Sequence, residues 1–171
     1  TAQLAAIGTS DIAAIDGTTL SKLNTTQIQS LSTAQIKALK ANQVQALGTS
    51  QIVALTTKQI QQLSVEDIKA FSATQVSKLS SSQIAALSMS ATQLGALTAS
   101  QLNAMDDSSL PYLKVSYLRP LSLAGMNQSK LNAMFVSIEQ TNKMSLEQWN
   151  LLGANKRKVL SGLMGTRIFY G

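Results

Sequence analysis

Cysteine and histidine are both absent from this sequence of 171 residues, and proline occurs only twice. Without them the chain has no disulfide, no thiol nucleophile, no histidine base and no zinc site of the usual ligand types. Charged residues make up only 13%, too few for a coiled coil, and aromatic residues only 4%. Hydrophobic residues still reach 44%, which is too many for a disordered tail.

No apolar run reaches the length of about 18 residues that a membrane-spanning helix needs, so we expect no transmembrane segment. The first residues also lack the charged region and the apolar core of a signal peptide. A cysteine-free chain rich in Ser, Thr and Gln fits an exported bacterial protein, so we expect it to be secreted or at the cell surface. The net charge of +6 is concentrated toward the C-terminus, with +2 in residues 1–105 and +4 in residues 106–171.

An eight-residue repeat runs through most of the sequence. Two apolar positions three residues apart recur fifteen times in residues 4–121, with one two-residue insertion after Leu87. In a continuous helix eight residues advance by about 800°, some 80° past two turns, so the apolar stripe would wind around the helix. In a strand, residues three apart point to opposite faces. The pattern therefore favours short separate helices, with a small β-solenoid as the alternative.

The residue after each second apolar position has the character of a helix start. It is Ser, Thr, Asp, Asn or Gly in thirteen of the fifteen copies, the types that cap helix N-termini. A glutamine three residues later completes a capping box, and the apolar residues on either side form a hydrophobic staple. The boxes that we expect include Ser32 with Gln35, Gly48 with Gln51, Thr56 with Gln59, Ser80 with Gln83, Ser90 with Gln93, and Ser145 with Gln148.

The insertion after Leu87 supports this interpretation. In the stretch SMSATQL, Ser90 with Gln93 restores the box, and Met89 with Leu94 restores the staple. The spacing changes while the capping pattern is kept, which favours capped helices over strands.

The predicted fold is all-α, a solenoid of very short capped helices with one helix per eight residues. Such helices are unstable alone, so the apolar pairs of neighbouring units must form a continuous narrow core. Alanine precedes the second apolar residue in nine copies and leaves room for a neighbouring backbone. We place the repeat array in residues 1–121 and a helical cap that closes the rod in residues 122–171.

The cap is predicted from larger side chains and longer helices. Six of the seven aromatic residues lie in residues 112–171. Residues 127–140 have the spacing of an ordinary amphipathic helix, with apolar residues from Leu131 to Ile138 on one face. Trp149 occupies a staple position, so we expect a buried anchor of the cap rather than an exposed binding residue.

The polar residues offer few candidates for a functional site. Four of the eight carboxylates occupy cap or box positions, so we expect no enzymatic activity, no metal and no cofactor. Lys156, Arg157 and Lys158, with Arg167 nearby, are a candidate binding patch for nucleic acid, anionic lipid or an acidic partner. The alternative is a solvated helix face or a helix C-terminus, where cations are favourable anyway.

The residues that follow each first apolar position vary freely, so they should face outward. This row is either a recognition surface or simply solvated. Its members include Gln29, Lys37, Gln45, Val53, Gln61, Lys69 and Ser77.

The units LSTAQIKAL and LTASQLNAM resemble the tandem L-[ST]-x-x-Q-[IV]-x-A-L arrays of large bacterial secreted and surface proteins. The resemblance covers about residues 4–121 and implies export and a structural or binding role. The stretch LGTSQIVAL is also similar to the first helix of the repeats in transcription-activator-like effectors of plant pathogens. This chain lacks their second helix and base-reading loop, so no base-reading residue carries over.

We therefore expect a non-enzymatic repeat scaffold, a stalk, spacer or protein-binding surface of an adhesin-like or effector-like protein, with a protein or surface partner. The alternative is a nucleic-acid-binding α-solenoid effector that uses its basic face and C-terminal basic cluster, motivated by the isoelectric point of about 9.7.

Overall fold

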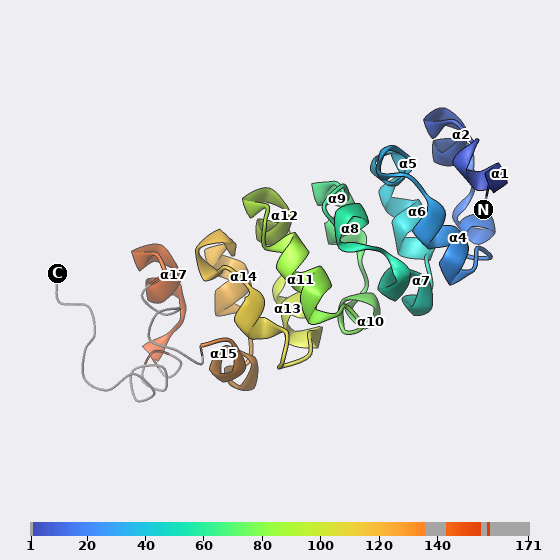
Figure 1. Cartoon of the computed structure of the whole chain (residues 1–171). Helices are drawn as coiled ribbons and strands as arrows, with labels where there is room; N and C mark the ends of the chain where they lie inside the picture. Colours follow the sequence, from blue (N-terminus) through green and yellow to red (C-terminus); the bar gives the residue numbers. More distant parts are fainter. Residues whose placement is uncertain (1, 136–142, 155–156, 158–171) are drawn as a thin grey trace.

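The computed structural model describes residues 2–135, 143–154 and 157, which form an elongated rod with α1 near one end and α17 near the other (Figure 1). Within these residues every regular element is an α-helix or a 3-10 helix, so the predicted all-α fold is confirmed. No helix in this part of the chain is long and apolar enough to cross a membrane.

We call the stretch from a cap residue to the second apolar residue a unit, and the glutamine position is its fourth residue. The first helices are α1 (Ala2–Ala5), α2 (Thr9–Ala14), α3 (Gly17–Leu20), α4 (Thr25–Ser30), α5 (Thr33–Ala38), α6 (Ala41–Ala46) and α7 (Thr49–Ala54). They are followed by α8 (Thr57–Ile60), α9 (Val65–Ala70), α10 (Ala73–Val76), α11 (Ser81–Leu87), α12 (Ala91–Gly95) and α13 (Ala99–Ala104). The last elements are η1 (Leu110–Tyr112), η2 (Val115–Tyr117), α14 (Pro120–Ala124), α15 (Gln128–Met134) and α17 (Leu146–Leu151).

A helix of the array ends where the second apolar residue leaves the helical conformation. Leu31, after α4, has φ −63° and ψ 132°, and the cap residue Ser32 has φ −67° and ψ 158°. The Leu31 N–H still donates to the Ile28 carbonyl at 3.2 Å, which closes the last turn. Two extended residues thus redirect the chain, and the cap starts the next helix at once.

The two apolar positions form one continuous core along the rod. Residues at the first position, such as Ile36 and Ile60, are fully buried, and those at the second, such as Leu47, are nearly so. Burying a side chain of this size contributes about 1.5–3 kcal/mol. This burial supplies the stability that a helix of four to seven residues lacks on its own.

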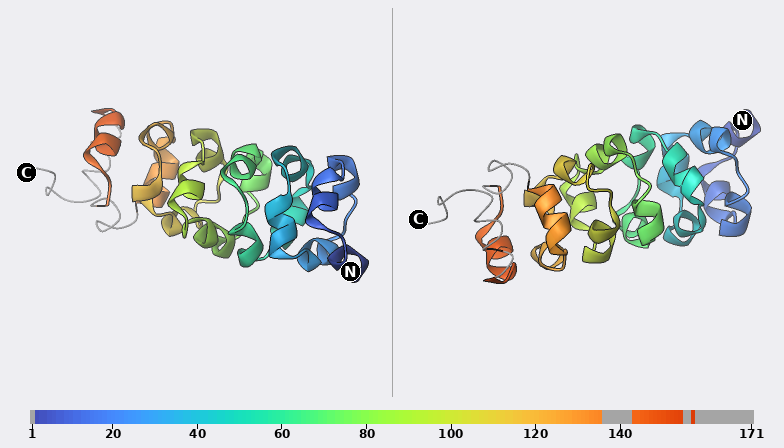
Figure 2. Two further views of the ribbon diagram at one scale, coloured as in Figure 1. Left: turned by 90° about the horizontal axis from the view of Figure 1, so that it is seen from above. Right: turned by 90° about the horizontal axis from the view of Figure 1, so that it is seen from below.

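Each unit packs against the unit three places further along the chain. Helix α3 packs against α6, and α6 packs against α9. A Cβ atom on Gly17 would lie only 2.6 Å from the Cβ of Ala46, and one on Gly125 only 2.5 Å from that of Ala99. Small residues therefore allow the close approach that the alanine pattern predicted, and successive turns stack along the rod (Figure 2).

The predicted staple at the insertion is wrong. Met89 is 68% exposed, so it does not pack against Leu94, which is fully buried. The two additional residues lengthen the end of α11 instead, where the Ser88 N–H donates to the Ile84 carbonyl at 3.0 Å. Met89 therefore lies beyond the last helical turn and outside the core.

The predicted apolar pair Leu118 and Leu121 is also wrong. Leu121 is 76% exposed, whereas Val115 and Leu118 are buried. The 3-10 turn η2 shortens this unit to five residues, 114–118, so the apolar pair moves three residues toward the N-terminus.

The helix predicted for residues 127–140 is shorter in the structure. It ends at Met134 because Phe135 has φ −93° and ψ 62°, outside the helical region. Leu131, Met134 and Phe135 are buried as expected, and Ile138 lies outside the described residues.

Candidate functional site

The cap residues hold the first turn of their helices by hydrogen bonds in both directions. In α5 the Gln35 N–H donates to the Ser32 Oγ at 3.2 Å, and the Ser32 N–H donates to the Gln35 Oε1 at 2.8 Å. The same reciprocal bonds join Thr56 with Gln59, Ser80 with Gln83, and Ser145 with Gln148. Each pair satisfies two N–H groups that the helix start leaves unpaired.

Two of the expected boxes have only one of these bonds. Gly48 has no side chain, so its N–H donates to the Gln51 Oε1 at 2.7 Å without a bond in return. At the insertion the Gln93 N–H donates to the Ser90 Oγ at 3.3 Å. The structure of the described residues has no reverse bond there, because the Ser90 backbone is displaced to φ −116° and ψ 118°.

The amide NH2 groups of the glutamines join one turn of the rod to the turn before. The Gln59 Nε2 donates to the Ile28 carbonyl at 2.9 Å and to the Leu31 carbonyl at 2.8 Å. Ile28 and Leu31 are the apolar pair of the unit four places earlier. We call these two contacts the interturn bonds. They are also made by Gln35, Gln43, Gln51, Gln75, Gln83, Gln93, Gln101 and Gln148.

The interturn bonds determine the geometry of the rod together with the core. Each unit packs against the third unit along the chain and bonds to the fourth, so one superhelical turn contains between three and four units. These glutamines are buried, with the Oε1 bound at the cap in most units and the Nε2 bound across the turn. A buried amide without partners would cost free energy, so the glutamine is tied to this position.

Each interturn bond joins a unit to the fourth unit before it, even where the number of residues between the two differs. A glutamine reaches 31 and 28 residues back across regular units, but Gln101 reaches 33 and 30 residues back because its bonds span the two inserted residues 88 and 89. Across the five-residue unit the separation falls to 25, where the Ser122 Oγ donates to the Leu97 carbonyl at 2.8 Å. The Lys130 Nζ donates to the Met105 carbonyl at 2.6 Å over the same separation.

Ser122 and Lys130 thus take the place of glutamine, and sequence reasoning missed both. Each follows its cap residue, Arg119 or Asn127, by three residues, so each occupies the fourth position of its unit. Counting units from these caps would have found them, once the shortened unit was known.

Helix α17 extends the same pattern into the segment predicted as a cap. The Gln148 Nε2 donates to the Val115 and Leu118 carbonyls at 2.8 and 2.7 Å. Trp149 is only 8% exposed and belongs to the core, in agreement with a buried anchor. The closing cap itself stays a prediction, since most of residues 136–171 lie outside the described part of the chain.

The basic patch is mostly outside the described residues. Arg157 is described and partly buried, and its N–H donates to the Gly153 carbonyl at 3.1 Å. Lys156, Lys158 and Arg167 are not described, so the patch stays a prediction.

The acidic side chains in the described part of the chain are dispersed, and no group of three potential metal ligands forms there. Asp16 caps α3, where hydrogen bonds from Thr18 and Thr19 hold the pKa of its carboxyl well below the usual range. Bonds from the Ser108 hydroxyl and N–H lower the pKa of Asp106 in the same way. Both carboxylates are ionised and bound in local turns.

The residues that follow each first apolar position face outward, as predicted. Those exposed are Gln29, Lys37, Gln45, Val53, Gln61 and Lys69, and Ser77 is half-buried.

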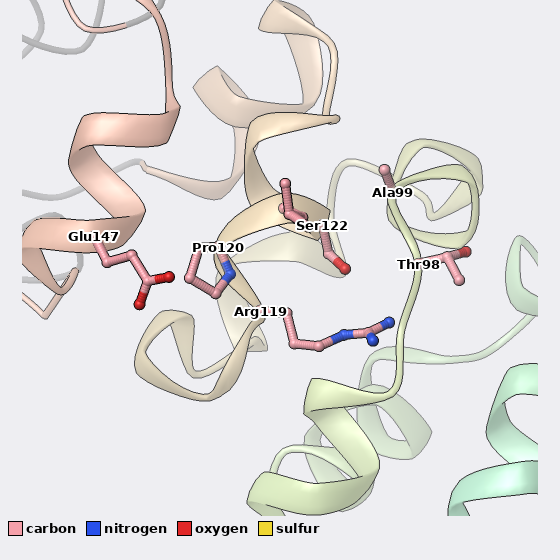
Figure 3. A pocket seen from close by; sticks show the side chains of 7 residues that line it. Thr98, Ala99, Arg119, Pro120, Ser122 and Glu147 are labelled. Carbon is pink, nitrogen blue, oxygen red and sulfur yellow. The ribbon is translucent and has the colours of Figure 1, made fainter.

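A groove of about 400 Å³ lies between α13, α14 and α17. Its lining consists of Thr98, Ala99, Arg119, Pro120, Leu121, Ser122 and Glu147. Figure 3 shows Arg119 and Glu147 extending on opposite sides of Pro120, with Arg119 directed toward Thr98. Exposed Leu121 lines the groove, and exposed Leu146 neighbours Glu147 in α17. The groove thus combines one exposed apolar side chain with a cation and an anion.

Residues 4–41, 12–49 and 36–65 each match the ALTTAQ repeat family. Residues 4–65 of the array are thus similar to the ALTTAQ repeat. Two of the matches begin eight residues apart, so this similarity has the same period as the units. It confirms the resemblance to tandem-repeat arrays and supports a repeat scaffold. No curated protein sequence matches the chain.

Proposed function

We propose that the chain is a non-enzymatic scaffold of an exported bacterial protein, a spacer of defined length that presents a protein-binding surface. The observation that carries the spacer role is the row of interturn bonds from Gln35 to Gln148, which joins each turn to the one before. A rod built this way keeps its curvature as units are added, so its length follows the number of units. Export is supported by the cysteine-free composition and by the resemblance to secreted arrays.

A deletion of four complete units tests the spacer role. Removing residues 40–71 deletes four complete units and joins Leu39 to the cap Ser72, so each remaining glutamine that makes interturn bonds still faces an apolar pair four units earlier. Small-angle scattering should show a rod shorter by about 8–10 Å, the usual distance between packed helices, with unchanged helical circular dichroism per residue.

The matched control removes residues 40–67 and joins Leu39 to Ile68 without a cap. This variant should lose stability and part of its helical signal. If the four-unit deletion loses as much structure as the control, the units are not interchangeable and the spacer proposal fails.

The protein-binding part of the proposal rests on the groove between α13, α14 and α17. Leu121 supplies an exposed apolar contact, while Arg119 and Glu147 provide charges of opposite sign on either side. The occupant that fits is a protein segment with one apolar side chain flanked by a carboxylate, which pairs with Arg119, and a cation, which pairs with Glu147.

Site-specific crosslinking tests this contact. A photoreactive residue at Leu121 should capture a partner that the same residue at Met89, which is also exposed but outside the groove, does not. Leu121→Asp and Arg119→Glu should then each weaken binding of that partner at least tenfold, whereas Met89→Asp should leave it unchanged. Equal binding by all three variants would reject the groove as the contact site.

The nucleic-acid alternative is separated by a salt titration. Binding of duplex or single-stranded DNA or RNA at about 50 mM salt, with affinity that falls steeply as salt rises, would favour it over the scaffold. We expect no such binding, because residues 1–105 carry a net charge of only +2.

A further inference from the structure

One unit of the array has a carboxylate where its neighbours have an amide. Asp67 occupies the fourth position of unit 64–71, between Gln59 and Gln75 in the adjoining units. Its Oδ2 accepts a hydrogen bond from the Ser64 N–H at 2.7 Å, as the glutamine Oε1 does elsewhere. Its Oδ1 is completely buried and has no hydrogen-bond partner. Asp67 therefore completes the cap but lacks the N–H groups for the interturn bonds.

The backbone groups that face Asp67 are carbonyl oxygens, which accept hydrogen bonds as its carboxylate does. In the register of the regular units, residue 67 faces the carbonyls 31 and 28 residues earlier, those of Ile36 and Leu39. Ile36 keeps one bond, from the Leu39 N–H at 3.1 Å. An ionised carboxylate placed among carbonyl oxygens is unfavourable, because it is a further acceptor with no donor. A proton on Oδ1 would convert it into the missing donor.

Among the described residues no cation offsets the buried charge, and Lys40, which follows Leu39 and precedes α6, is exposed. Helices α6 and α12 pack against α9 and carry no titratable side chain. On α9 itself, Glu66 forms an exposed ion pair with Lys69 at 2.8 Å, and Lys37 of α5 is exposed to solvent. Burial raises the pKa of the Asp67 carboxyl above its ordinary value, the bonds from Ser64 oppose this, and the charge of Glu66 adds to it.

We propose that Asp67 is a proton-binding site that makes the contact between units 32–39 and 64–71 pH-dependent. With the proton bound, Asp67 donates to the turn that contains Ile36 and Leu39, and the row of interturn bonds has no gap. Without the proton, the contact between units 32–39 and 64–71 lacks its interturn bonds, while the neighbouring units keep theirs.

The direction of the pH effect follows from proton binding. The folded protein holds this proton more tightly than the unfolded chain does, since the folded pKa is raised. The stabilisation is complete below the unfolded pKa of about 3.9 and is lost as the pH rises through the folded pKa. The contact between these two units is therefore more stable in acid and less stable toward neutral pH. A capping carboxylate behaves in the opposite way.

The test compares the full chain with Asp67→Gln and Asp67→Asn, which cannot titrate. The unfolding equilibrium constant of the wild type relative to each variant should fall as the pH is lowered, by up to tenfold per pH unit between the folded and unfolded pKa values. Asp11→Asn is the control, since Asp11 holds the same fourth position in unit 8–15 but is exposed, and the ratio for this variant should lack the trend. A wild-type to variant ratio that is constant from pH 3 to pH 8 would reject the proposal.

A second measurement does not depend on how the variants fold. The carboxyl carbon of Asp67 in the wild-type chain should titrate by NMR above the range of exposed aspartates, and the amides of residues 36–39 should shift at the same pH. Titration of Asp67 at or below the usual aspartate pKa would also overturn the proposal.

Discussion

Replacing Gln59 by methionine should show how strongly the interturn bonds hold the rod together. Methionine has nearly the same length and volume as glutamine, so the change removes hydrogen bonds without opening a large cavity. The Gln59 side chain accepts from the Thr56 N–H at 2.8 Å and donates to the carbonyls of Ile28 and Leu31.

The magnitude follows from the groups that lose their partner. Ile28 keeps a bond from the Leu31 N–H at 3.2 Å, so the Leu31 carbonyl and the Thr56 N–H are the groups left without one. An unsatisfied buried group costs about 1–3 kcal/mol. Thr56 lies at the surface, where water can replace part of its bond, so we expect a total loss of about 2–4 kcal/mol.

Urea unfolding followed by circular dichroism measures this loss. For ordinary denaturant slopes the midpoint should fall by about 1–2 M. Gln61→Met is the matched control, because Gln61 lies two residues away with its side chain exposed. This variant should change the free energy of unfolding by less than about 0.5 kcal/mol. If Gln59→Met and Gln61→Met unfold at the same urea concentration, the interturn bonds do not stabilise the rod and the reasoning is wrong.

Further predictions concern caps, packing and charge. Replacing Ser32, Thr56 and Ser80 together by Ala should cost roughly 1 kcal/mol per cap in urea unfolding, and no loss would mean that the caps are not formed. Gly17→Ala should destabilise by about 1–3 kcal/mol through the contact with Ala46, and the double variant with Ala46→Gly should recover most of it. The lowered pKa of Asp16 stabilises the fold above pH of about 3.9, so the advantage of the wild type over Asp16→Asn should shrink as the pH falls further.

The capped units were predictable because they depend on local rules. A residue such as Ser32, followed after three residues by Gln35 and flanked by apolar residues, specifies a helix start whatever surrounds it. The same periodicity identified the core, since Ile36 and its counterparts are buried throughout the array.

The interturn bonds were not predicted, because their partners lie some thirty residues away and no local rule connects them. One signal was present. Glutamate completes a capping box as well as glutamine does, yet it never occupies the fourth position in residues 4–121. Only the amide also donates, so the use of glutamine rather than glutamate in nine units indicated a second set of acceptors. Asp67, the shorter acid at that position, is therefore the clearest exception in the array.

The irregular units were predicted poorly because spacing alone does not say which residues are skipped. Leu121 has the expected distance of eight from Leu113, but η2 uses Val115 and Leu118 in its place. Met89 was paired with Leu94 by the same kind of counting. In both places the chain kept the number of units per turn and changed the length of one unit.

The interturn bonds join residues that are 25 to 33 positions apart wherever they occur in the described rod. This separation does not grow as units are added, so the mean contact separation relative to chain length falls in a longer array. Closing the loop for each new turn carries the same entropic cost as for the last one, because the loop has the same length. Each new turn forms these bonds only with the turn before it. A longer rod of this kind therefore requires more folding steps, each as fast as the one before.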